Sequence, residues 1–108
     1  MLKVISSAKM IEKPEPWGSS KILFKNDKTK SEIGLFKCSA GKSMDMHKHE
    51  ESDELIYVLN GKAIFEDEEG IEEVEAGSAV YLPRNKLHKA VNKGQEDYWC
   101  LYVVSNLE

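Results

Sequence analysis

The chain contains the stretch Gly41-KSMDM-His47-K-His49-EESD-Glu54-LIYVLN-Gly61, in which two histidines and a glutamate surround a short polar loop. Alternate side chains of a β-strand point to the same face, so His47 and His49 share one face while Lys48 points away. After the loop, the apolar run that begins at Glu54 predicts a second strand, with the glutamate at its first position. We therefore expect the three side chains to converge.

A third histidine lies in the stretch Gly77-SAVYL-Pro83-R-Asn85-KL-His88-KAV-Asn92. This stretch predicts a strand, a turn led by Pro83, and another strand that opens near the imidazole of His88. Three imidazoles and one carboxylate suit a first-row divalent ion and leave one or two coordination positions for water or substrate. The sequence thus predicts a metal site whose ligands are His47, His49, Glu54 and His88.

The two stretches resemble the two motifs of the cupin family. The first follows the family pattern without departure, and the second departs only at Asn85, where the family has glycine. Asparagine is the non-glycine residue that best tolerates a positive φ, so we expect the turn to form. The resemblance covers roughly residues 34–104. It implies an all-β fold, the double-stranded β-helix or jelly-roll barrel of the cupins.

The resemblance also implies one divalent transition metal per chain, which could be zinc, iron, nickel, manganese or copper. The alternative is a purely structural set of histidines, because a lone histidine near a strand end is most often a surface or core-edge residue. Many barrels of this family keep the fold while losing ligands. In this chain no ligand position of the two motifs is substituted, which favours metal binding.

The remaining sequence predicts short strands separated by turn residues, with no helical periodicity. Strands at this spacing indicate a sandwich or barrel of the jelly-roll kind. The acidic residues around 66–75 could form a calcium site, but a solvated hairpin that protects a sheet edge is the preferred interpretation. The expected strands are 20–25, 32–38, 44–49, 54–59, 62–66, 71–75, 79–82, 88–92 and 97–104.

A chain of 108 residues predicts one domain over residues 1–108, with an N-terminal segment 1–30 ahead of the barrel core. Hydrophobic residues at 41% and charged residues at 31% are typical of a globular protein. The net charge of -4 argues against a nucleic-acid partner, which would require a basic face.

We expect neither export nor membrane insertion. The first ten residues lack an apolar stretch of signal-peptide length, and the longest apolar run, 98–104, is too short to span a bilayer. The expected location is therefore the cytoplasm. In a reducing compartment, Cys38 and Cys100 are expected to be buried free thiols in apolar strands.

One predicted strand carries apolar side chains on both faces. The position of Glu54 places Ile56 and Val58 inside the barrel, which leaves a second apolar set on the outer face: Leu55, Tyr57 and Leu59. The N-terminal segment 2–11 could cover this face. A second subunit is the alternative, and cupins commonly pair back to back, so we expect a homodimer.

Two classes of function stay open. The first is a metalloenzyme, such as an isomerase, dioxygenase or lyase, that binds a small oxygen-rich or anionic molecule. Arg84 and Lys86, on the turn before His88, could attract the anion, or they could simply be solvated. The second class is a metal-dependent binding or sensing barrel without turnover. A separate general acid or base is hard to find in the sequence, so the choice between the two classes stays open.

The segment Pro14-EPWGSSKIL-Phe24 is similar to the PWG segment that precedes the barrel of cupin-type mannose-6-phosphate isomerases. In such an enzyme the metal would polarise the sugar carbonyl while basic residues hold the phosphate. The link from His49 to Glu54 is longer here than in that family, and Glu50 stands where the family has arginine. Trp17 could alternatively be an apolar anchor on the barrel wall.

Overall fold

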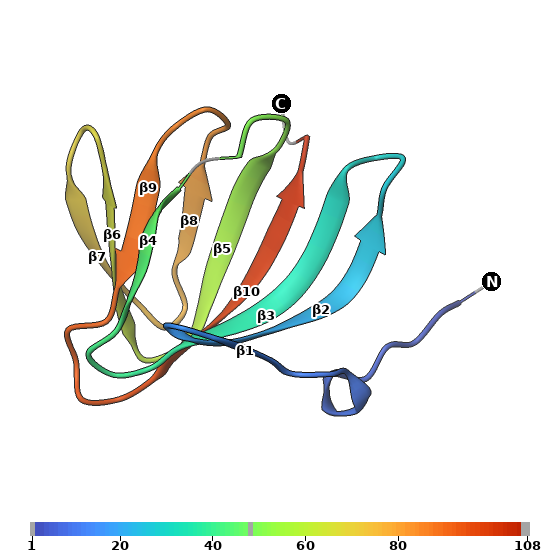
Figure 1. Ribbon diagram of the computed structural model, residues 1–108, viewed down its shortest axis with the longest axis horizontal. Helices are drawn as coiled ribbons and strands as arrows, with labels where there is room; N and C mark the ends of the chain where they lie inside the picture. The colour runs from blue at the N-terminus through green and yellow to red at the C-terminus, as the bar shows by residue number, and fades with distance from the viewer. Residues whose placement is uncertain (1, 48, 107–108) are drawn as a thin grey trace.

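The computed structural model describes residues 2–47 and 49–106, with only the backbone at 45–47 (Figure 1). The described chain is almost entirely strand, apart from one short 3-10 helix, η1 (Ser7–Lys9). The strands are β1 (Lys13–Glu15), β2 (Gly18–Asn26), β3 (Ser31–Cys38), β4 (Ser43–His47), β5 (Asp53–Asn60), β6 (Lys62–Asp67), β7 (Ile71–Glu75), β8 (Ala79–Leu82), β9 (His88–Val91) and β10 (Tyr98–Ser105).

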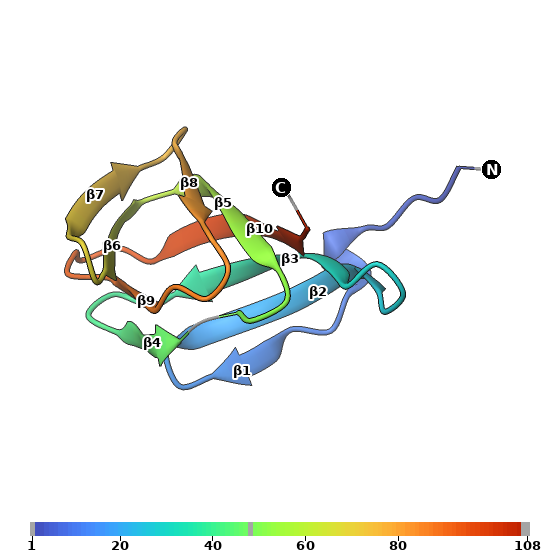
Figure 2. The ribbon, with the colours of Figure 1, turned by 90° about the horizontal axis from the view of Figure 1, so that it is seen from above.

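The strands form two antiparallel sheets that face each other (Figure 2). One sheet has six strands in the order β1-β2-β3-β10-β5-β8, and the other has four in the order β4-β9-β6-β7. Neighbours in the sheets are often far apart in sequence, as where β10 lies between β3 and β5. This arrangement is the predicted all-β jelly-roll barrel.

The core lies between the two sheets and follows the alternation of each strand. In β5, Ile56 and Val58 are buried, as the position of Glu54 predicts. The neighbouring strand β10 buries Tyr98, Cys100 and Tyr102 in the same way. Both cysteines are free and buried, as expected.

The outer face of β5 is not covered by the N-terminal segment. That segment runs away from the sheets beyond η1 (Figure 1), and Leu2 and Val4 are more than 90% exposed. The outer residues Leu55, Tyr57 and Leu59 remain 38–47% exposed. The interpretation in which the N-terminal segment 2–11 covers this face is therefore wrong.

Two local features differ from the sequence prediction. Strand β4 ends at His47, so His49 lies in the following loop and not in the strand expected over 44–49. Its carbonyl accepts a hydrogen bond from the Asn85 backbone N–H at 2.7 Å and so pairs with the turn before β9. Strand β1 is an addition to the expected strands, and its central Pro14 is tolerated because β1 lies at the edge of the six-stranded sheet.

The turn at Asn85 is as predicted. Its φ is 62°, in the left-handed region that asparagine tolerates better than other residues with a side chain. In the described part of the chain, no helix is both long and apolar enough to cross a membrane.

Candidate metal centre

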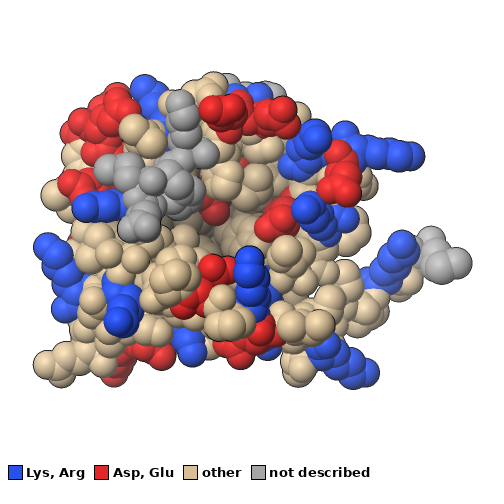
Figure 3. Space-filling model, viewed as in Figure 1, with Lys and Arg blue, Asp and Glu red and all other residues tan. Residues whose placement is uncertain are grey.

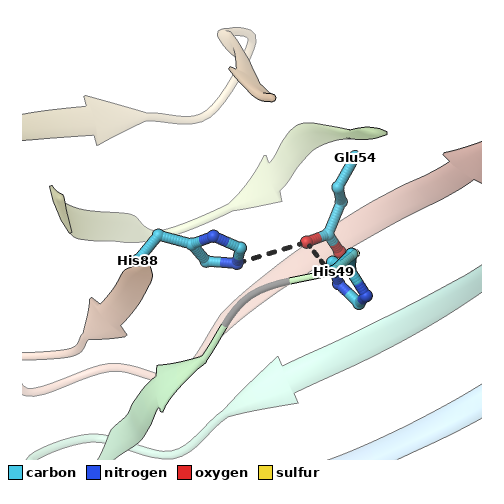
Figure 4. Close-up of side chains that lie close together, drawn as sticks. All are labelled: His49, Glu54 and His88. Atoms are coloured by element: carbon cyan, nitrogen blue, oxygen red, sulfur yellow. Dashed lines mark ion pairs between the residues drawn. The ribbon is translucent and has the colours of Figure 1, made fainter. Parts of the chain in front are cut away.

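Three of the four predicted ligands converge on one point inside the barrel (Figure 4). His49 follows β4, Glu54 is the second residue of β5, and His88 is the first residue of β9. They therefore come from both sheets, and their side chains point toward one another across the interior. Glu54 and His88 are buried, and His49 is partly buried.

The distances between the donor atoms match those between the ligands of a small metal ion. The Nε2 atoms of His49 and His88 lie 3.4 and 3.5 Å from the same oxygen of Glu54, Oε1. All three groups offer ligand atoms within 4.8 Å of one another. Ligands bound tetrahedrally at about 2.1 Å lie about 3.4 Å apart, so the two imidazoles and the carboxylate fit a first-row divalent ion.

Backbone hydrogen bonds position the two histidines, one at its ring and the other at its main chain. Nδ1 of His88 lies 3.2 Å from the Lys86 carbonyl, which can only accept, so a neutral His88 with its proton on Nδ1 would offer the Nε2 lone pair to a bound ion. The Asn85 N–H holds the backbone of His49 from the same turn. Such outer hydrogen bonds orient metal-binding histidines and fix their tautomer.

The electrostatics of the cluster favour a charged carboxylate. Without a metal, burial raises the pKa of Glu54, but the hydrogen bonds and positive charge of protonated His49 and His88 together outweigh it and lower the pKa to about 2. The hydrogen bond to Glu54 in turn raises the pKa of His49 above its usual 6.5, despite partial burial. Glu54 is thus an ionised oxygen donor over the whole physiological pH range.

The side chain of the fourth predicted ligand, His47, lies outside the described structure. Its backbone ends β4 and is paired with His88 in the ladder between β4 and β9. Its role as a ligand stays a prediction.

Arg84 and Lys86 lie beside the centre in sequence, but neither lines its cavity in the described structure. The guanidinium of Arg84 binds the buried Asp53 through two contacts, Nε to Oδ1 at 3.2 Å and Nη2 to Oδ2 at 3.0 Å. Its backbone N–H also donates to Oδ1 at 2.9 Å. This paired arginine fastens the turn before β9 to the start of β5, while a role of the two residues in anion binding stays a prediction.

A cavity of about 210 Å³ opens from the three ligands into the barrel. Its walls are mostly apolar and include Trp17, whose ring meets that of Phe36 edge-on at 5.8 Å between centroids. Trp17 is thus the apolar wall residue that the sequence offered as one option. The space-filling view is hollowed near its centre, and acidic side chains border the hollow (Figure 3).

The sequence reasoning missed a second polar group in the cavity, formed by Glu32 and Tyr102. The Tyr102 hydroxyl donates to Oε2 of Glu32 at 2.6 Å. The inward position of Glu32 could have been predicted from the alternation of β3, because Glu32 shares a face with the buried Phe36 and Cys38.

Comparison with known proteins agrees with this architecture. Residues 34–104 match the family model described as the cupin domain. An oxalate-binding protein from Thermotoga maritima is 31% identical over 68 residues, which are 63% of this chain and 56% of that protein. The matched region thus spans little more than half of that relative's length.

Solved structures show the same fold at lower identity. A predicted oxalate decarboxylase from Thermotoga maritima superposes with a TM-score of 0.83 at 23% identity, covering 97% of this chain and all of the other. KdgF from a Halomonas species superposes with a TM-score of 0.84 at 21% identity, covering 98% of this chain and 96% of the other. At these identities the likeness concerns the fold alone.

Proposed function

This chain belongs to the cupin domain family, and on that basis we propose that it binds a small oxygen-rich or anionic metabolite at a divalent transition metal held in its barrel. His49, Glu54 and His88 hold the ion, with His47 as the expected fourth ligand. The metal, when bound, supplies a Lewis acid with open positions for a ligand oxygen.

The observation that carries this proposal is the convergence of two imidazole Nε2 atoms on one buried carboxylate oxygen at the end of a cavity. A buried carboxylate without a cation would be costly, and two histidines alone supply a cation only when protonated. A divalent ion satisfies all three donors at neutral pH. The adjoining cavity provides room for a compact ligand.

Similarity to an oxalate-binding protein supports a carboxylate as the first ligand to test. Whether the bound molecule is also transformed is a separate question, and the two classes of function differ in one measurable respect. An enzyme would convert its ligand in the presence of the metal, whereas a sensor would release it unchanged.

The phosphosugar alternative needs basic residues to hold the phosphate. No lysine or arginine is among the described residues that line the cavity. The structure therefore adds no support to a mannose-6-phosphate isomerase activity, and the binding of a small carboxylate or polyol is the function we favour.

The first test measures metal content by elemental analysis after reconstitution and dialysis. We expect about one transition metal ion per chain in the unaltered protein. Glu54→Gln keeps the shape of the side chain but removes its charge. Loss of a residue that only hydrogen-bonds a metal ligand lowers metal affinity roughly tenfold to hundredfold, so loss of the ligand charge should lower it by more.

A matched control is Glu66→Gln, the same chemical change at a surface ion pair with Lys89, where the two groups lie 3.2 Å apart. This variant should bind metal as the unaltered protein does. Lack of stoichiometric metal in the reconstituted protein, or equal affinities in the two variants, would contradict the proposal.

A further inference from the structure

The cavity contains a second carboxylate, Glu32, on the same sheet as Glu54 and two strands away from it. The Cα of Val104 in β10 is in register with Glu32 of β3 on one side and with Glu54 of β5 on the other. Adjacent strands lie about 4.8 Å apart, which places the two glutamate backbones about 10 Å from each other. Because all three residues line the cavity, it runs from the candidate metal centre to a second acidic group.

Tyr102 holds Glu32 in position. Its ring lies over Gly34, its register partner in β3, where an added Cβ would come within 2.5 Å of the hydroxyl oxygen. The absent side chain lets the phenol reach along β3 to the carboxylate two residues away. Burial, together with the neighbouring Glu32, raises the pKa of Tyr102, so the hydroxyl remains a donor.

Glu32 also lies where the inner cavity meets a second hollow. That outer hollow, about 640 Å³, is lined by the N-terminal segment around residues 9–15 and by Ser20, Glu32 and Tyr102. The same three residues line the inner cavity. A ligand that enters through the outer hollow therefore passes the carboxylate before it reaches the centre.

We propose that Glu32, oriented by Tyr102, makes this cavity select ligands that carry a hydroxyl or ammonium donor at the end distant from the metal, and reject dicarboxylates of the same length. The inference rests on the proposed function, because it assumes that the other end of the ligand coordinates the ion. It adds the chemical class of that ligand.

The physical basis is the asymmetry of a carboxylate, which accepts hydrogen bonds and donates none. A ligand hydroxyl or ammonium group gains a charge-assisted hydrogen bond from it. A second ligand carboxylate instead meets a like charge and is repelled, beside the apolar walls formed by Trp17, Phe36 and Phe65. The volume of about 210 Å³, comparable to about seven water molecules in the liquid, restricts the ligand to a compact molecule.

The test compares two four-carbon probes, 2,4-dihydroxybutanoate and malate, by calorimetry on the metal-loaded protein. Both chelate through a 2-hydroxy acid, and they differ only in whether the far end is a hydroxyl or a carboxylate. The unaltered protein should prefer the dihydroxy acid by about tenfold or more, the usual value of a hydrogen bond to a charged group. Glu32→Gln should bring the two affinities within about threefold, because the amide also donates.

A second variant, Tyr102→Phe, keeps the ring but removes the donor to Glu32, and should reduce the preference without loss of metal. The matched control is Glu12→Gln, since Glu12 likewise accepts a hydroxyl hydrogen bond, from Ser19 at 2.6 Å, but does not line the cavity. It should keep the full preference. Melting temperatures confirm that each variant is folded.

Metal content is measured on the same samples, which separates the two proposals. A protein without metal would overturn the proposed function, and this inference with it. A metal-loaded protein that binds neither probe, prefers malate, or keeps its preference in Glu32→Gln would overturn the inference alone.

Discussion

At the scale of single residues, the pH dependence of metal binding depends on the two histidines and not on the glutamate. Against burial, the hydrogen bonds and positive charge of the two imidazoles lower the pKa of Glu54 to about 2, so it is ionised throughout the range from pH 5 to 8. The pKa of His49 is raised above 6.5, mainly by its hydrogen bond to Glu54. Protons therefore compete with the ion at the imidazole near neutral pH.

We predict that metal affinity falls as the pH is lowered through the imidazole range, beginning above the usual 6.5 because the pKa of His49 is raised, by about tenfold per pH unit for each proton displaced. A chelator competition at pH 5 to 8 measures it. In the metal-free protein the raised pKa of His49 has the opposite effect. It stabilises the folded state at a pH below the pKa of His49 in the unfolded chain, and this contribution is lost as the pH rises. An affinity that is flat from pH 8 to 5 would show that imidazoles do not hold the ion.

At the scale of elements, the turn between β8 and β9 connects the fold to the centre. It contains three features: the left-handed Asn85, the backbone N–H that binds the His49 carbonyl, and Arg84 paired with buried Asp53. The Lys86 carbonyl that holds His88 belongs to the same turn. A change in this backbone should therefore affect both imidazoles at once.

We predict that Asn85→Gly, which restores the residue typical of cupins, leaves both stability and metal affinity within error of the unaltered protein. Asn85→Val should lower the free energy of unfolding by about 1–2 kcal/mol, because a β-branched residue is strained at positive φ. It should also weaken metal binding. Urea unfolding and metal titration test both variants, and equal behaviour of glycine and valine would refute a positioning role for this turn.

Most strands could be predicted because their alternation and turn residues are local signals. The position of Glu54 alone correctly assigned the two faces of β5. Strand β1 could not be predicted in this way, because Lys13-Pro14-Glu15 forms a strand only by pairing with β2. The end of β4 before His49 likewise depends on a hydrogen bond from Asn85, which is distant in sequence.

At the scale of the whole molecule, two long motifs predicted the barrel and the convergence of four ligands. The structure brings three of them together, from β5, from β9 and from the loop after β4. The cavity could not be predicted, since its second acidic group requires the register of β3, β10 and β5 to bring Glu32 and Glu54 to one interior. The partner of Arg84 was missed for the same reason. The sequence places Asp53 in a loop, and only the packing of β5 against the β8–β9 turn brings it to Arg84.

The outer face of the six-stranded sheet carries apolar side chains that the described chain does not cover: Leu55, Tyr57, Leu59 and Tyr81 are 38–47% exposed. Leu55 is in register with Tyr81 of β8 and Val103 of β10, and Tyr57 with Leu101, so these side chains form one continuous patch. Exposed apolar patches of this kind mark interaction sites. We propose that a second copy of the chain covers it, in a two-fold symmetric dimer.

Light scattering on the purified protein should therefore return about twice the 12.3 kDa of one chain. Leu55→Lys places a charge in the patch and should shift the protein toward the monomer, because a buried unpaired charge is costly at an interface. Ile71→Lys makes a similar change on β7 of the other sheet, at a residue that is 64% exposed, and should leave the dimer intact. A monomer at high concentration, or equal dissociation by both variants, would mean that this face is solvated in the isolated protein.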